Sequence, residues 1–369
     1  MPQRLSLFLA LTFFLSIQPA RAADDDPVIA GKKASEWLEL LEKGDKPEKR
    51  RAAVIALGIA GPKTTGAVAG LSKALREDKA PEVRREAATT IRNMGTEAID
   101  AMEYLADALK EDKDEIVRMV SATALGRMAD KAKPAVPILT AALKDKHAGT
   151  RSAAAEALGQ FKIDARDSVP ALIEAALDKS NDRFIRSYAV ISLGRIGGDA
   201  DAITAALVKI LGEEGIGSEV REVVIDVVGQ FGSDAREATP LLAKALKDPQ
   251  INVRRKAATS LGKIGPSAKE AIPELREALK KETDKLLVCS LIHTLGVFGK
   301  DAREAVPDLV LKTKADMYLE VRLAAIEELG RIGPDAKEAL PALMVAQKDG
   351  RTDIREAATE ALKKIQSMP

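Results

Sequence analysis

The side chains best suited to chemistry are one cysteine and two histidines, which is few for a chain of 369 residues. Cys289 and His293 are four residues apart, so on a helix they would lie one turn apart and could touch. A thiol beside an imidazole can support nucleophilic catalysis, but no third group that would orient the imidazole is recognisable in the sequence. His147 is far from His293 in the chain, and no H-E-x-x-H or C-x-x-C motif occurs. We therefore expect no catalytic residue, no bound cofactor and no metal site.

A second set of functional groups is a series of carboxylate and guanidinium pairs with a fixed spacing. An aspartate precedes an arginine by six residues in Asp78/Arg84, Asp112/Arg118, Asp145/Arg151, Asp248/Arg254, Asp316/Arg322 and Asp349/Arg355. A guanidinium binds a carboxylate through two parallel hydrogen bonds. We interpret these residues as a structural ladder, in which each arginine contacts carboxylates and turn carbonyls of neighbouring copies of a repeat.

The repeat is a unit of about 34 residues that recurs from about residue 36 to the C-terminus. In the copy at residues 253–282, apolar residues that include Leu261 follow one face of a predicted helix, which Gly265 ends. Ser267–Glu270 has the form of a capping box, which predicts the start of a second helix. Pro273 falls inside this helix and should kink it or mark a late restart. One copy is then a helical hairpin with a single apolar side, and copies must stack to bury that side.

The arginine position of the unit recurs in ten slots along the chain: Arg50, Arg84, Arg118, Arg151, Arg186, Arg221, Arg254, Val288 in the same slot, Arg322 and Arg355. Ten slots predict ten helix pairs, with the first helix near Ser35–Glu42. The last copy, Thr352–Gln366, replaces the glycine of the unit with Lys363 and is predicted to be a polar capping helix.

These motifs resemble those of the HEAT-repeat family, in particular the short bacterial type also found in phycobilisome lyases. The resemblance rests on V-R-x-x-A-A-x-x-L-G-x-I-G, on A-V-P-x-L-x-x-A-L-K-D and on the Asp–Arg spacing. It implies an all-α fold, a right-handed α-solenoid of about ten HEAT-like helix pairs. Tetratricopeptide repeats have a similar period, but they need large aromatic positions, and only 3% of this chain is aromatic.

The N-terminal segment predicts export. Residues 1–22 read as a signal peptide, because Arg4 precedes the apolar run Leu5–Ile17 and Ala20-Arg21-Ala22 matches a cleavage site. An uncleaved anchor or a buried first helix is the alternative. We expect residues 23–34 to be a disordered polar linker and residues 35–369 to form the solenoid. The mature protein is predicted to be periplasmic or secreted, without a membrane span after cleavage.

Composition restricts the partners. Lysine and arginine number 57 and aspartate and glutamate 56, which gives no overall attraction to nucleic acid or to an anionic membrane. Cys289, as the single cysteine, has no partner within the chain for a disulfide. We expect a protein or peptide partner and no nucleic acid.

The family resemblance implies that the helix bearing the arginine lines the concave side of the solenoid. On that helix, the side chains at positions one, five and nine after the arginine slot point away from the hydrophobic core. Departures from the repeat pattern in copies five, six and eight define a candidate patch of Ile191, Arg195, Asp226, Gln230, Lys263, His293 and Val297. Its mixed charges and few apolar groups resemble a polar protein interface.

The predicted function is that of a non-catalytic, exported scaffold or adaptor that binds protein or peptide on the concave face. Two alternatives stay open. One is a bilin-lyase-type enzyme or subunit, which the repeat subtype suggests, and the other is a purely structural component of an envelope assembly.

Overall fold

The computed structural model describes residues 26–314 and 318–367. The predicted signal peptide at residues 1–22 lies outside these ranges, as does Asp316 of the predicted ladder. The helices follow one another in pairs: α1 (Ala34–Lys43), α2 (Pro47–Ala60), α3 (Ala67–Glu77), α4 (Pro81–Met94), α5 (Met102–Glu111), α6 (Glu115–Arg127), α7 (Val136–Ala142), α8 (Ala148–Gln160), α9 (Val169–Leu177), α10 (Arg183–Ile196), α11 (Ala200–Leu211), α12 (Ser218–Gln230), α13 (Thr239–Ala245), α14 (Ile251–Ile264), α15 (Ile272–Lys281), α16 (Lys285–Val297), α17 (Val306–Lys312), α18 (Leu319–Ile332), α19 (Leu340–Ala346) and α20 (Thr352–Gln366).

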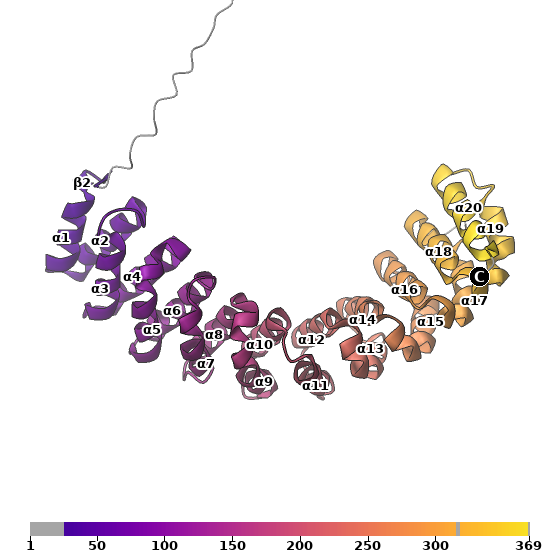
Figure 1. Ribbon diagram of the computed structural model, residues 1–369, viewed down its shortest axis with the longest axis horizontal. Helices are drawn as coiled ribbons and strands as arrows, with labels where there is room; N and C mark the ends of the chain where they lie inside the picture. Colours follow the sequence, from indigo (N-terminus) through magenta and orange to yellow (C-terminus); the bar gives the residue numbers. More distant parts are fainter. Residues whose placement is uncertain (1–25, 315–317, 368–369) are drawn as a thin grey trace, which may run out of the picture.

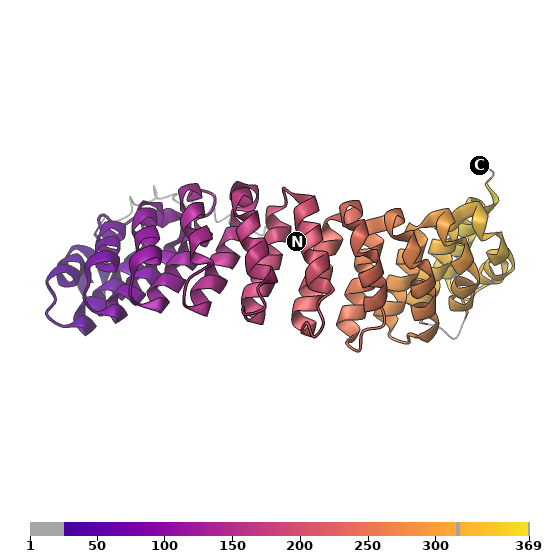
Figure 2. The same ribbon diagram turned by 90° about the horizontal axis from the view of Figure 1, so that it is seen from below.

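The pairs stack side by side into one curved all-α solenoid (Figure 1). The even-numbered helices, which carry the arginine slots, line the concave side, and the odd-numbered helices from α3 onward line the convex side. Each even-numbered helix packs against the even-numbered helices before and after it. Figure 2 shows the arc from the perpendicular direction as a single row of hairpins. The ten predicted pairs and the predicted first and last helices therefore agree with the described part of the chain.

The core runs unbroken along the whole stack, because every hairpin buries its apolar side against its neighbours. Leu261 of α14 is fully buried, like the leucines at the same slot in α2, α6 and α8. Glycines allow the concave helices to approach closely. A Cβ atom added at Gly262 would lie 2.9 Å from Oγ1 of Thr294, and one at Gly126 would lie 2.8 Å from Cβ of Ala157. A larger residue at either glycine would push neighbouring copies apart.

The connection inside most hairpins differs from the predicted capping box. Residues Gly265–Ala271 form a 3-10 helix, and α15 begins at Ile272 rather than near Ser267. Pro273 lies in the first turn of α15, where a missing backbone N–H costs no hydrogen bond, so it marks the start of the helix. Equivalent 3-10 segments are Gly95–Ala101, Lys133–Ala135, Lys162–Ser168, Gly232–Ala238, Gly299–Ala305 and Gly333–Ala339.

The N-terminal edge of the solenoid carries a small hairpin, in which β1 (Val28–Ile29) pairs antiparallel with β2 (Lys32–Lys33). The sequence predicts a disordered linker at residues 23–34, and the structure differs over this part of it. The reason is Trp37, whose buried indole donates from Nε1 to the carbonyl oxygen of Ile29 at 2.9 Å. Trp37 also joins the hydrophobic core.

None of the helices in the described ranges combines the length and the apolar character that crossing a membrane requires.

Candidate functional site

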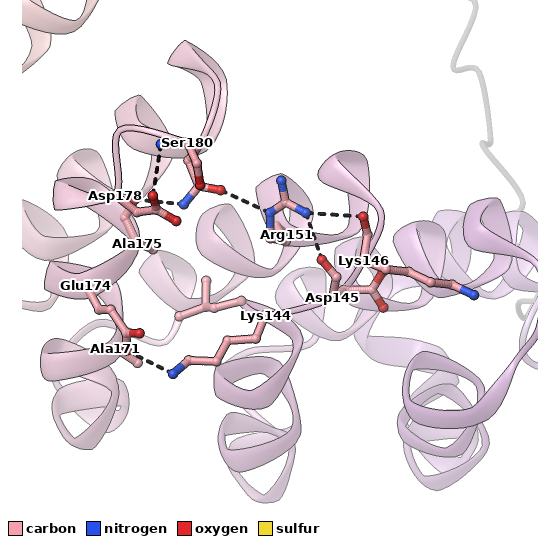
Figure 3. Close-up of a pocket in the computed structure, with 11 residues that line it drawn as sticks. Lys144, Asp145, Lys146, Arg151, Ala171, Glu174, Ala175, Asp178 and Ser180 are labelled. Carbon is pink, nitrogen blue, oxygen red and sulfur yellow. Dashed lines mark hydrogen bonds and ion pairs between the residues drawn. The ribbon is translucent and has the colours of Figure 1, made fainter.

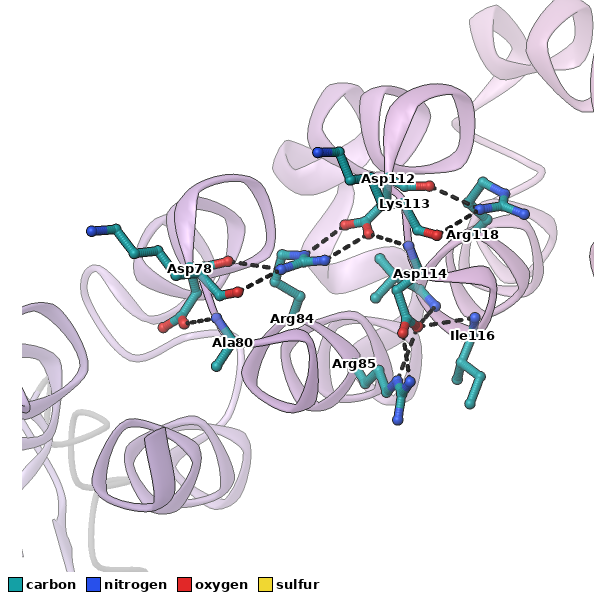
Figure 4. A network of polar contacts seen from close by, with 11 residues as sticks. Asp78, Ala80, Arg84, Arg85, Asp112, Lys113, Asp114, Ile116 and Arg118 are labelled. Atoms are coloured by element: carbon teal, nitrogen blue, oxygen red, sulfur yellow. Dashed lines mark hydrogen bonds and ion pairs between the residues drawn. The ribbon is translucent and has the colours of Figure 1, made fainter. Parts of the chain in front are cut away.

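The charged ladder runs along the turns that lead into the concave helices (Figure 4). Arg84 donates from Nε and Nη2 to both carboxylate oxygens of Asp112, in the next copy, at 2.7 and 2.8 Å. Its Nη1 donates to the carbonyl oxygen of Asp78, six residues earlier, at 2.9 Å. Arg118 repeats this geometry toward Asp145. Each arginine thus binds the backbone of its own turn and the carboxylate of the following turn.

The aspartates of the ladder also hold the turns in which they lie. Asp78 accepts a hydrogen bond from the backbone N–H of Ala80 at 2.9 Å while it pairs with Arg50. Burial is the largest single influence on the pKa of Asp78, and it opposes ionisation. The bonds from Arg50 and Ala80 and the nearby guanidinium charges nevertheless keep the pKa of Asp78 below its usual value. The ladder is therefore a structural device, with its charges matched between copies.

The ladder continues with variations in later copies. Arg254 pairs with Glu282 at 2.6 Å, and Arg186 pairs with Glu213 at 2.8 Å. Arg221 pairs with Asp248, and Arg322 pairs with Asp349. In the last copy Arg355 binds carbonyl oxygens and a threonine, since no described copy follows it.

The rung at Arg151 has an arginine but no carboxylate partner (Figure 3). Its Nε meets the amide oxygen of Asn181 at 3.1 Å, and its Nη1 donates to the carbonyl oxygens of Asp145 and Lys146. Among the described residues it forms no ion pair. The turn after it has an extra residue, so Asp178 caps its own turn by accepting from the N–H of Ser180 at 2.9 Å.

The predicted patch lies on four adjacent concave helices. Ile191 and Arg195 are on α10, Asp226 and Gln230 on α12, Lys263 on α14, and His293 and Val297 on α16. Arg195, Gln230, Lys263 and His293 are exposed, whereas Ile191, Asp226 and Val297 are half-buried.

One ion pair and one shared depression connect neighbouring parts of this patch. Lys263 lies 3.7 Å from Asp226, measured from Nζ to Oδ1. Lys263 and His293 line one depression with Cys289 and Thr259, over Gly262.

Sequence reasoning missed Glu328, the residue beneath His293. Nδ1 of His293 lies 2.9 Å from Oε1 of Glu328, whose side chain is only 5% exposed. Nε of Arg331 lies 3.2 Å from Oε2, yet this oxygen makes no hydrogen bond among the described residues. Burial, the largest influence, raises the pKa of Glu328, and the bond from His293 and the charge of Arg331 do not reverse it.

A signal for Glu328 is present in the repeat itself. The sixth position after the arginine slot holds alanine, serine, threonine or valine in every other copy, for example Ser260 and Thr294. These small hydroxyl side chains donate to a backbone carbonyl of the preceding copy, at 2.8 Å in both cases. Glu328 fits only because Gly296 faces it: a Cβ atom there would lie 1.7 Å from Oε2.

The sequence shows no third group that would orient the imidazole of His293 beside Cys289. In the structure, Glu328 is in the position to do so. The thiol, however, is not prepared as a nucleophile. Burial and the nearby Glu320 carboxylate raise the pKa of Cys289, and no hydrogen bond joins it to His293 in the described part of the chain. Over the same residues, no group of three or more histidine, cysteine, aspartate or glutamate side chains is placed to bind a metal ion.

Comparisons with known proteins agree with this architecture. The family described as HEAT repeats matches residues 34–126, 102–194, 136–215 and 204–296. An engineered protein of known structure has a TM-score of 0.62 and 22% identity, over 91% of this chain and 99% of its own. Kap95p bound to RanGDP has a TM-score of 0.57, and Kap95 bound to Nup1 has 0.58; both are 14% identical over 90% of this chain. The chain spans half the length of Kap95. No curated protein matches by sequence.

Proposed function

Because the chain belongs to the HEAT-repeat family, we propose that it is a non-catalytic, exported adaptor that binds a protein or peptide partner on its concave face. The carrying observation is the concave surface of α10–α16, where exposed Arg195, Gln230, Lys263 and His293 lie on successive helices. A few half-buried apolar groups beside charges of both signs suit a polar protein interface. The structures of Kap95 with RanGDP and Nup1 show that a similar solenoid can hold protein partners.

The test is capture of proteins from the envelope fraction of the native host with the immobilised mature chain. Reversal of charge at Arg195 and Lys263 should reduce capture of the partner at least about tenfold and leave the melting curve unchanged. The matched control reverses Lys363 and Lys364, which are exposed on α20, outside the patch. Lys363, like Arg195, has no ion pair among the described residues, and Lys364 lies 3.7 Å from Glu360, as Lys263 does from Asp226. No loss from the first pair of reversals would refute the concave patch.

Export is the second part of the proposal, and it is supported by Ala20-Arg21-Ala22. N-terminal sequencing of protein from the native envelope fraction should find Ala23 as the first residue. Recovery of chains that begin with Met1 would contradict export by cleavage.

The short bacterial repeat type favours a bilin-lyase-type role as the alternative. Purified protein that carries a coloured tetrapyrrole would support it, and self-assembly without any partner would instead support a structural role in the envelope.

A further inference from the structure

Two of the three outward positions on the concave helices, positions five and nine after the arginine slot, separate their charges by sign. Residues nine positions after the arginine slot include Arg127, Arg195, Lys263, Arg331 and Lys364, and none of the ten is acidic. Residues five positions after the slot include Glu156, Asp226, Glu327 and Glu360, and none of the ten is lysine or arginine. We call these the basic row and the acidic row. The two rows lie one helical turn apart on the even-numbered helices, which follow one another along the arc of Figure 1.

Between α6 and α14 the rows alternate from one helix to the next. A base stands on α6 (Arg127), an acid on α8 (Glu156), a base on α10 (Arg195), an acid on α12 (Asp226) and a base on α14 (Lys263). In this stretch each helix therefore presents a single charge at these two positions, and the sign changes at every step.

The polar groups of this stretch are largely free to bind a partner. Arg127, Gln160, Arg195 and Gln230 are exposed, and none has a hydrogen bond or ion pair among the residues that the structure describes. The pair of Lys263 and Asp226 is loose, at 3.7 Å, and both side chains are nearly half exposed.

The surface between the helices is also hollowed. Arg127, Gln160 and Glu156 line one depression over Gly126. A depression of the same kind lies over Gly262, beside Lys263.

We propose that this stretch binds an extended polypeptide segment whose acidic side chains face the basic row and whose basic side chains face the acidic row. The inference rests on the proposed function and specifies the partner. Packed helices are about 8–10 Å apart, and an extended chain advances about 3.3 Å per residue, so one helix corresponds to about three residues. Since successive side chains of an extended chain point to opposite edges, an offset of three changes the edge, as the alternating rows require. The matching segment has the form E-x-x-K-x-x-E-x-x-K-x-x-E, which reads the same in both directions.

The test measures binding of a labelled peptide of this pattern, about thirteen residues long with serine and threonine at the other positions, by fluorescence anisotropy at low salt. A peptide of the same composition with its glutamates and lysines in two blocks, and a polyglutamate of the same length, are the controls. The patterned peptide should bind at least about tenfold more tightly than either control. Equal binding of the three peptides would overturn the proposal.

Substitution locates the site. Arg195→Glu, at the centre of the stretch, should weaken the patterned peptide at least about tenfold, and Lys364→Glu, outside it, should change binding less than about twofold. Equal effects of the two substitutions would overturn the placement on α6–α14. If the natural partner is captured through Arg195 and Lys263 but the patterned peptide does not bind, the adaptor function stands and the extended segment is refuted. If neither binds, the proposed function fails as well.

Discussion

Asp78 and Glu328 are both buried carboxylates between stacked copies, with side chains 6% and 5% exposed, yet their pKa values move in opposite directions. For both, burial is the largest influence and opposes ionisation. Asp78 receives two bonds from Arg50 and one from a backbone N–H, so its pKa is lowered. Glu328 has one hydrogen bond, from His293, and its pKa is raised. The completeness of the donor set therefore decides in which direction the pKa of a buried carboxylate moves.

The largest expected effect comes from removing the donor of Asp78. Arg50→Ala leaves a buried carboxylate without its bidentate partner, which typically costs about 3–5 kcal/mol of stability. Urea unfolding and hydrogen exchange of the first two copies measure it. The control is Arg51→Ala, whose side chain is 53% exposed and pairs with Glu86, where a loss of about 0–1 kcal/mol is expected. Equal losses of stability from Arg50→Ala and Arg51→Ala would show that a buried ion pair of the ladder is worth no more to the fold than an exposed one.

A smaller effect is expected at the rung of Arg151. Arg151→Ala removes hydrogen bonds to an amide and to carbonyl oxygens, but it strands no buried carboxylate. The loss should be about 1–2 kcal/mol, below that of Arg50→Ala in the same urea series. A loss as large as that of Arg50→Ala would mean that the guanidinium itself, and not the paired carboxylate, is what the fold requires.

Glu328 should show the opposite pH response from Asp78. Because its pKa is raised in the folded protein, its contribution is present below its usual value of 4.5 and is lost as pH rises through the folded value. Glu328→Thr, which restores the residue type of the neighbouring copy, should therefore stabilise the protein by about 1 kcal/mol at pH 8, and the gain should fade toward pH 4. Thermal melts across this range measure it. A gain that does not depend on pH would contradict the assignment.

Asp78 supplies the matching half of that comparison. Its lowered pKa means that its contribution is present above the usual value of 3.8 and is lost as pH falls further. Asp78→Asn should therefore be most costly near neutral pH and cost progressively less in acid. A constant cost from pH 7 to pH 2 would show that the hydrogen bonds, and not the charge, stabilise the turn.

The smallest effect on stability is expected on the concave face. Arg195→Glu leaves no buried partner, because Arg195 is exposed and unpaired among the described residues. The free energy of unfolding of this variant should differ from that of the unchanged protein by less than about 0.5 kcal/mol. A larger change, measured by urea unfolding, would show that Arg195 stabilises the fold, as the ladder arginines do. It would then no longer be a candidate binding residue.

The repeat period, the helix pairs, the arginine slots and the polar last helix are legible in the sequence, because each depends on local spacing within one copy. The stacked solenoid follows from them, since one hairpin cannot bury its apolar side alone. The residues of the concave patch are predictable from the sequence. The separation of charge into two rows is visible only when positions five and nine after the arginine slot are compared with each other.

Contacts between copies were decided only by the tertiary structure. The sequence pairs Asp78 with Arg84 by spacing, whereas the fold gives Arg84 the carboxylate of Asp112, 28 residues later. Likewise Glu328 and His293 are 35 residues apart, and they meet only because Gly296 lets α18 approach α16. Local spacing determines which face a side chain occupies. The partner on the next copy depends on how the copies stack, and stacking depends on the packing of all the residues between them.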